Sequence, residues 1–179
     1  MKLLSLDQST SAVGVGFFID DKLIDYWLIK PKSSKRADEI WVSEEPHLIA
    51  ITMPEEQYGT TLLRITVISD QIEKLIDQFE PDEIWFEEIF ENANPKGFRS
   101  LARLQGFIAH IAHKHDIKYT IVEESKWITA WGKYGRGVKR PERKADVRQK
   151  VNDYYNLSIE VDDISDAIGI GRYAVENRT

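Results

Sequence analysis

The chain has 179 residues, with 24 Lys and Arg against 30 Asp and Glu, a net charge of −6 and no cysteine. This length predicts one domain, residues 1–179, that can bury a core without disulfides. The missing cysteines exclude zinc fingers, iron–sulfur clusters and thiolate nucleophiles, and they favour a reducing, cytoplasmic location. No apolar run approaches the roughly 20 residues of a membrane span, so we expect no membrane partner.

Three β-rich runs open the chain, at Leu3–Asp7, Val13–Ile19 and Lys22–Ile29. Asp20 and Asp21 separate the last two runs and predict a hairpin, so these three strands should be antiparallel. From Pro31 to about Thr60, Pro, Ser and charged residues break up the pattern. We therefore expect an irregular insertion at residues 31–60.

The remaining chain alternates between helical and strand patterns. The spacing of apolar residues predicts helices at about Leu62–Phe79, Gly97–His115, Arg143–Tyr155 and Asp163–Asn177, and strands at Glu83–Ile89 and Lys118–Val122. This order predicts an α/β fold, a mixed five-stranded sheet with its first three strands antiparallel and helices on both faces.

The positive charge is concentrated in residues 126–150, a predicted basic loop and helix start with nine Lys and Arg and two acids. Trp127, Trp131 and Tyr134 lie among these basic residues, as expected of a surface that binds nucleic-acid phosphates. A solvated charged face explains the composition equally well. The candidate phosphate-binding residues are Lys126, Lys133, Arg136, Lys139, Arg140, Arg143 and Lys144.

Four acids stand at positions where a charge is costly. Asp7 ends the first strand, Glu87 lies in an apolar strand, and Asp163 and Asp166 open the last helix three residues apart, on neighbouring positions of its surface. Each acid alone can be explained as a helix cap or a turn former. Clustered together they would repel one another unless a cation neutralised them, and oxygen ligands suit Mg²⁺ or Mn²⁺. Two such ions can stabilise both the attacking and the leaving oxygen of a phosphodiester displacement.

Four segments together resemble the RuvC family of Holliday junction resolvases. They are Leu-Ser-Leu-Asp-Gln-Ser-Thr-Ser at 4–11, Phe-Glu-Glu-Ile-Phe at 86–90, Leu-Gln-Gly at 104–106 and Asp-Ile-Ser-Asp-Ala-Ile-Gly-Ile at 163–170. The resemblance implies a ribonuclease H-like fold, a homodimer with 97–115 as its dimerisation helix, and structure-selective cleavage of four-way DNA junctions.

Carried over to this chain, the family's metal-binding acids fall on Asp7, Glu87, Asp163 and Asp166. The resemblance favours Glu87 over Glu88 because the family's Glu follows an apolar residue and precedes an aromatic by three positions. That aromatic is Phe90, a candidate wedge between DNA bases. The implied cofactors are two Mg²⁺ ions per active site, for which Mn²⁺ can substitute.

The chain also departs from the family pattern. Gln8 and Ser9 replace the usual Pro-Gly after the first Asp, and residues 31–60 are longer than the family's usual connection. Short, divergent members of this kind are typical of bacteriophages, and some cut three-way or fork branches. A phage-encoded protein of the bacterial cytoplasm is therefore expected.

Two other functions remain open at this stage. Leu-Asp-Gln-Ser-Thr-Ser at 6–11 also resembles the phosphate-binding hairpin of sugar-kinase-like ATPases, although one such domain is too short for that activity. The third alternative is a catalytically inactive module that binds branched DNA.

Overall fold

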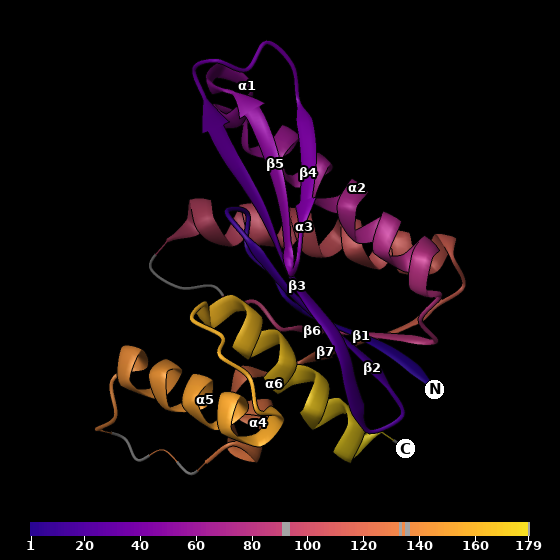
Figure 1. Ribbon diagram of the computed structural model, residues 1–179, viewed down its shortest axis with the longest axis vertical. Coiled ribbons are helices and arrows are strands. Elements are labelled where there is room, and N and C mark those ends of the chain that lie inside the picture. Colours follow the sequence, from indigo (N-terminus) through magenta and orange to yellow (C-terminus); the bar gives the residue numbers. More distant parts are fainter. Residues whose placement is uncertain (91–93, 133, 135–136, 179) are drawn as a thin grey trace.

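The computed structural model of the chain describes residues 1–90, 94–132, 134 and 137–178. In these residues, seven strands form one sheet in the order β4-β5-β3-β2-β1-β6-β7 (Figure 1). The strands are β1 (Lys2–Asp7), β2 (Val13–Ile19), β3 (Lys22–Ser34), β4 (Trp41–Glu45), β5 (Leu48–Pro54), β6 (Glu83–Glu87) and β7 (Lys118–Val122). The helices are α1 (Glu55–Gly59), α2 (Thr61–Phe79), α3 (Pro95–Lys114), α4 (Glu124–Trp127), α5 (Arg140–Tyr155) and α6 (Asp162–Asn177), with a short 3₁₀ turn at Ile128–Ala130.

The centre of the sheet follows the predicted topology. Strands β1, β2 and β3 are antiparallel, whereas β6 is parallel to β1 and β7 is parallel to β6. Because β1 and β6 are parallel and Leu6 pairs with Phe86, Asp7 and Glu87 end neighbouring strands at the same edge. The mixed α/β class is thus confirmed.

The prediction of a five-stranded sheet with an irregular insertion at 31–60 is wrong. Strand β3 continues to Ser34, and β5 pairs parallel to it from Leu28↔Leu48 to Ser34↔Pro54, with β4 on the outer edge. Pro31 argued against a strand at this position in the sequence, because proline cannot donate a ladder hydrogen bond. It is tolerated because β2 pairs with β3 only as far as Ile29, which leaves β3 with a neighbour on one side beyond that point.

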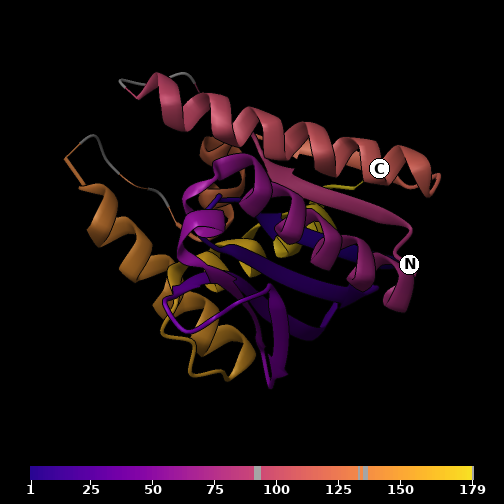
Figure 2. The ribbon, with the colours of Figure 1, turned by 90° about the horizontal axis from the view of Figure 1, so that it is seen from above.

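Helices cover both faces of the sheet, as predicted (Figures 1 and 2). On one face, α2 and α3 bury apolar side chains against Leu4 and Leu6 of β1. On the other face, α6 packs on Leu3 and on Phe18 of β2, with α4 and α5 beyond it. Since side chains alternate along a strand, Asp7 shares the α6 face with Leu3. No helix in the described part of the chain is long and apolar enough to cross a membrane.

A glycine of β2 sets the distance between the sheet and the start of α6. A Cβ atom added at Gly14 would lie 1.8 Å from the carbonyl oxygen of Asp163. Only a residue without a side chain allows the helix backbone so close. This close approach brings the first turn of α6 to the strand end that carries Asp7.

Candidate active site

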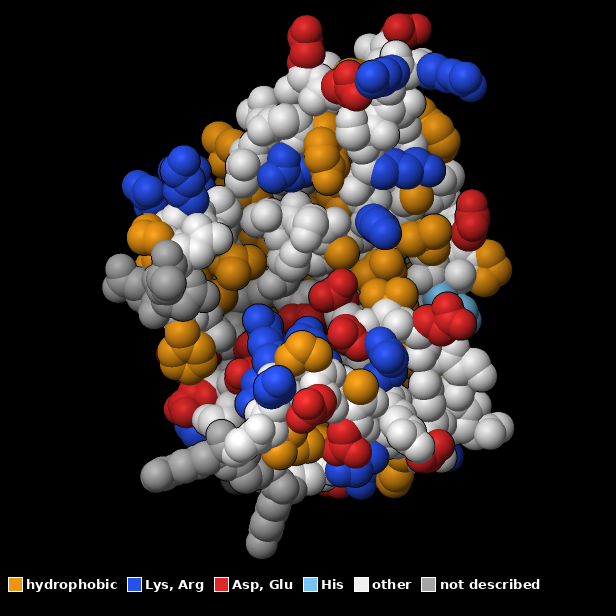
Figure 3. All heavy atoms as spheres, turned by 90° about the vertical axis from the view of Figure 1, so that its left-hand side faces the viewer, with side chains coloured by type: hydrophobic (Ala, Val, Ile, Leu, Met, Phe, Trp, Pro, Cys, Tyr) orange, Lys and Arg blue, Asp and Glu red, His pale blue; other side chains and the backbone are white. Residues whose placement is uncertain are grey.

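A cavity of about 600 Å³ opens where β1 and β6 end. Its lining includes the candidate ligands Asp7, Glu87 and Asp163 together with Lys144 and Arg140. Figure 3 shows this face of the molecule, with acidic side chains gathered in its central hollow and Lys and Arg side chains around them. The concave acidic centre with a basic surround suits a polyanion held over bound cations.

Asp7 lies at the centre of the acidic group. Burial raises its pKa well above the usual range, and the nearby charges of Asp166, Glu87 and Asp163 raise it further. The fold thus brings the other three predicted carboxylates close enough to Asp7 for their charges to raise its pKa. Acids with raised pKa values in a cleft are typical of functional sites.

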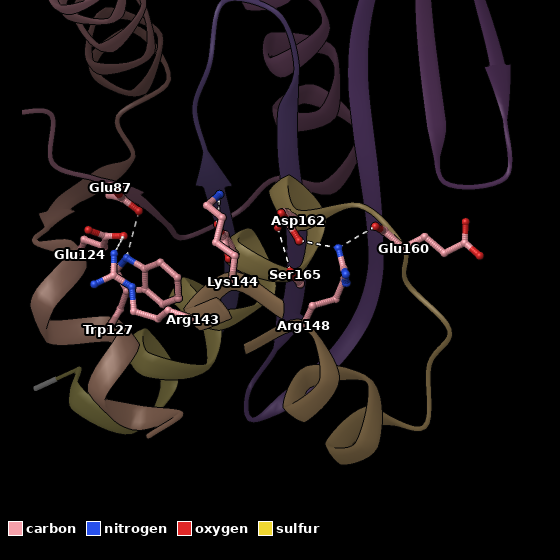
Figure 4. Close-up of polar contacts among 10 residues, drawn as sticks. Glu87, Glu124, Trp127, Arg143, Lys144, Arg148, Glu160, Asp162 and Ser165 are labelled. Carbon is pink, nitrogen blue, oxygen red and sulfur yellow. Dashed lines mark hydrogen bonds and ion pairs between the residues drawn. The ribbon is translucent and has the colours of Figure 1, made fainter. Parts of the chain in front are cut away.

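Glu87 is held on the α6 face of the sheet. Trp85 of the same strand packs in the core beneath α6, so Glu87, two residues on, points to the same side as Asp7. Trp127 Nε1 donates a hydrogen bond of 3.1 Å to Glu87 Oε2 (Figure 4). Burial and the neighbouring charge of Glu124 raise the pKa of Glu87 to about 7. Glu88 also lines the cavity, one residue beyond the end of β6.

Asp163 and Asp166 stand on the first turns of α6, and burial raises the pKa of both carboxyl groups. Lys144 of α5 opposes this effect. Its Nζ lies 2.6 Å from Asp166 Oδ2, and its positive charge lowers the pKa of Asp7, Asp163 and Glu87. Burial alone would lower the pKa of Lys144, but the pairing with Asp166 more than compensates.

The donor set fits a hard divalent cation. Among the described residues, no three acidic or histidine side chains already stand as close as the ligands of one ion. Asp166 Oδ1 is nevertheless buried without a hydrogen-bond partner in this part of the chain. A buried oxygen of this kind, among carboxylates whose pKa values are raised, can serve as a ligand for a cation. In the structure, the ammonium group of Lys144 provides the positive charge beside Asp166.

The candidate DNA-binding residues fall into several groups. Phe90 is 56% exposed and lines the cavity, as does Arg140. Lys126 pairs with Glu123 at 2.9 Å, and Arg143 pairs with Glu124 at 2.9 Å. Lys139 is exposed at the start of α5. Lys133 and Arg136 lie outside the described residues.

Sequence reasoning did not assign a role to the residues that hold Glu87 in place, although Gln8 and Gln105 stand in the quoted motifs. The side-chain amides of Gln8 and Gln105 donate to the Glu87 carbonyl oxygen at 2.9 and 3.2 Å. Glu124 also lines the cavity and affects the pKa of Glu87. Gln8 follows Asp7 directly, which is a usable signal, whereas nothing in the sequence around Glu124 marks it.

Comparison with known proteins shows where this chain belongs. The profile of a family described as Lactococcus phage M3 protein matches residues 47–176. The chain belongs to this family.

The curated relatives of this chain carry the name crossover junction endodeoxyribonuclease RuvC. The protein of Ruminiclostridium cellulolyticum is 32% identical over 112 residues, which cover 60% of this chain and 63% of that protein. The Pseudothermotoga lettingae protein is 29% identical over 140 residues, covering 74% and 82% of the two chains. The chain thus spans less than two thirds of the first relative's length. The resemblance to RuvC that the motifs indicated is confirmed.

The fold agrees with these relatives. A solved structure of Thermus thermophilus RuvC in complex with Holliday junction substrate superposes with a TM-score of 0.68 at 14% identity, over 99% of this chain and 96% of that one. At this identity the superposition shows that the two proteins share a fold.

Proposed function

We propose that the chain is a structure-selective endonuclease, a single nuclease domain over residues 1–179, that hydrolyses phosphodiester bonds in Holliday junctions or other branched DNA. The observation that carries the proposal is the convergence of Asp7, Glu87 and Asp163 on one cavity, with Asp166 buried close enough for its charge to act on Asp7. The names of the curated relatives support it, since they are junction endodeoxyribonucleases. As a phage-family protein with bacterial relatives, it would work in the cytoplasm of a bacterial cell.

Asp7, Glu87, Asp163 and Asp166 would hold two Mg²⁺ ions, with Mn²⁺ able to substitute. When bound, such ions activate water and stabilise the charge on the reacting phosphate. Residues of the chain hold the proposed ligand Glu87 in position. Gln8 and Gln105 fix the backbone at Glu87, and Trp127 orients its carboxylate.

Lys144 has two tasks in this proposal. In the protein alone it neutralises Asp166 and reduces repulsion among the acids. With cations bound, its ammonium group becomes available to contact the phosphate oxygens of the substrate, next to Arg140 on the cavity wall. Charge stabilisation from fixed cations of this kind is a large contribution to catalysis.

The remaining predicted contacts surround this centre. Phe90, exposed at the cavity, would contact bases at the branch, and Lys126, Lys139 and Arg143 would contact the DNA backbone. Lys126 and Arg143 would first have to leave their ion pairs. Lys133 and Arg136 complete the proposed set.

A homodimer would place two such sites on one junction. The exposed face of α3 supports this part of the proposal, because Phe107 is 36% exposed and a Cβ atom at Gly106 would meet no atom within 4 Å. A small residue next to an exposed aromatic ring lets a helix of a second copy approach closely.

Cleavage of synthetic four-way, three-way and linear DNA, side by side with and without Mg²⁺ or Mn²⁺, tests the proposal. We expect metal-dependent cutting of branched DNA that is lost in Asp7→Asn and Asp166→Asn. Cutting that survives both substitutions would refute the carboxylate site. Junction binding without any cutting would favour the inactive DNA-binding module, and ATP turnover without DNA would favour the kinase-like enzyme.

A further inference from the structure

The positive charges of the basic segment are largely used inside the protein. Of the seven Lys and Arg residues of this segment that the structure describes, five are ion-paired, in the pairs Lys126–Glu123, Arg143–Glu124, Lys144–Asp166, Arg148–Asp162 and Lys150–Asp146. A cation already paired with a carboxylate contributes less to phosphate binding, because the pair must break first. The DNA-binding charge must therefore come partly from elsewhere.

Cations without such partners lie on the outer half of the sheet, in a segment that also carries the acids Asp38, Glu39, Glu44 and Glu45. We call residues 30–54 the wing; they comprise the end of β3 and the whole of β4 and β5. Figure 1 shows these strands extending together away from the body of the molecule. Within the described residues, no carboxylate lies at ion-pairing distance from the four wing cations, which are Lys30, Lys32, Lys35 and Arg36. All four side chains are exposed.

The two faces of the wing differ in character. Ile49, Ile51 and Met53 of β5 are buried in the core beneath α2. Lys30 and Lys32 alternate with these positions and share the opposite face with Leu28, which belongs to the core beneath α6. This second face is polar and exposed, so the wing has one covered side and one open side.

An aromatic side chain lies in register with the lysines on the open side. Lys32 pairs with Thr52, and Thr52 pairs with Trp41, so the three form one row across β3, β5 and β4. The Lys32 ammonium lies 5.6 Å from the centre of the Trp41 ring, which is 47% exposed. A flat ring beside cations can stack on a base or sugar while the lysines meet phosphates.

The open face begins at the proposed active site. Leu28 of β3 pairs with Gly14, against which the Asp163 backbone lies, and Lys30 stands two residues farther along β3. From Lys30 to Ser34 the strand extends about 13 Å at roughly 3.3 Å per residue, and Lys35 and Arg36 stand in the turn that follows. The extended part matches about four base pairs of duplex at about 3.4 Å each.

We propose that the open face of the wing binds the sugar–phosphate backbone of the DNA arm that leaves the active site. Lys30, Lys32, Lys35 and Arg36 contact successive phosphates, and Trp41 provides the flat contact beside them. DNA fits this surface better than a protein partner does, because Trp41 is the one large apolar side chain exposed in the described wing. The proposal rests on the proposed function, since it takes branched DNA as the substrate.

The test compares two triple variants that lose the same charge. One is Lys32→Gln, Lys35→Gln and Arg36→Gln on the wing. The control is Lys2→Gln, Lys22→Gln and Lys74→Gln, which removes three cations from the far end of the sheet and from α2. Binding of a labelled four-way junction is measured by fluorescence anisotropy in EDTA over a range of salt concentrations.

Each lost phosphate contact lowers the slope of log affinity against log salt by about 0.9, so the wing variant should lose about 2 to 3 from its slope. The control variant should keep the wild-type slope. Trp41→Ala should weaken binding about tenfold with an unchanged slope, because stacking involves no counterion release. The single variant Lys32→Gln should lose about 0.9 from the slope, which guards against a folding defect in the triple variant.

Equal slopes for the wing and control variants would overturn the proposal. Failure of the nuclease is distinguishable from this result. A wild-type protein that binds junctions but cuts none in Mg²⁺ or Mn²⁺ refutes the proposed function, while the slopes still decide whether the wing contacts DNA.

Discussion

Replacement of Glu87 by Gln should make the metal-free protein more stable while it abolishes cleavage. The ionised carboxylate of Glu87 is unfavourable in the folded protein because it is buried next to Glu124, and its pKa is about 7 against an ordinary value of 4.5. A folded pKa raised above the unfolded value means that stability is lost as pH rises between the two values. Glutamine removes this loss and keeps an oxygen that can accept from Trp127 Nε1.

The size of the effect follows from the two pKa values. At about 1.36 kcal/mol per pH unit, the difference corresponds to at most about 3 kcal/mol at pH 8. Neighbouring carboxylates share the proton, so we expect a gain of about 1 to 3 kcal/mol in the free energy of unfolding at pH 8. At pH 4.5 the gain should shrink to a small fraction of this value. Urea unfolding in EDTA at both pH values, followed by tryptophan fluorescence, measures it.

Glu88→Gln is the matched control, one residue along the same strand end. It should change the free energy of unfolding by less than about 0.5 kcal/mol at either pH and should retain cleavage. The reasoning is refuted if Glu87→Gln destabilises the protein at pH 8. It is also refuted if cleavage is lost in Glu88→Gln and kept in Glu87→Gln, since the ligand would then be the neighbouring acid.

Three further predictions concern the same site. The affinity for Mn²⁺, measured by calorimetry in several buffers, should rise with pH up to about 7 and level off above it. Binding should release protons, because the cation must displace them from acids with raised pKa values. An affinity that does not change between pH 5 and 7 would contradict the raised pKa values. Gly14→Ala should cost about 3 kcal/mol of unfolding free energy and impair cleavage, because the added Cβ would lie 1.8 Å from the Asp163 carbonyl oxygen. The control Gly59→Ala, whose Cβ would meet no atom within 4 Å, should be nearly neutral. Equal effects of the two substitutions in thermal melts would count against the close approach. Lys144→Ala should lower the melting temperature at pH 8, because the substitution removes the cation partner of Asp166. Mn²⁺ should raise the melting temperature of this variant more than that of the wild-type protein. An equal rise in both proteins would show that Lys144 does not neutralise the site.

The ion pairs explain why net charge is a poor guide to the proposed DNA-binding surface. Residues 126–150 carry an excess of seven positive charges, yet the fold pairs Lys126, Arg143 and Lys144 with acids from elsewhere in the chain or from the neighbouring turn. A sequence lists charges in chain order, whereas phosphate binding depends on which charges the folded protein leaves unpaired.

The sequence by itself determined the main helices and the central strands, and it singled out four acids as candidates. The periodicity of apolar residues placed the helices and the central strands, because burial of one face imposes a repeat of 3.6 or 2 on the chain. Asp7, Glu87, Asp163 and Asp166 stood out because a charge at a strand end or beside a core stripe is costly unless it has a use. These features depend on neighbours in the chain.

Only the tertiary structure decided the rest. It made residues 31–60 the end of β3, the strands β4 and β5 and helix α1, because packing of α2 on that side of the sheet buries Ile49, Ile51 and Met53. It brought Lys144 to Asp166 across 22 positions and Trp127 to Glu87 across 40. Contacts over such separations come from the packing of whole elements, and no local pattern records them.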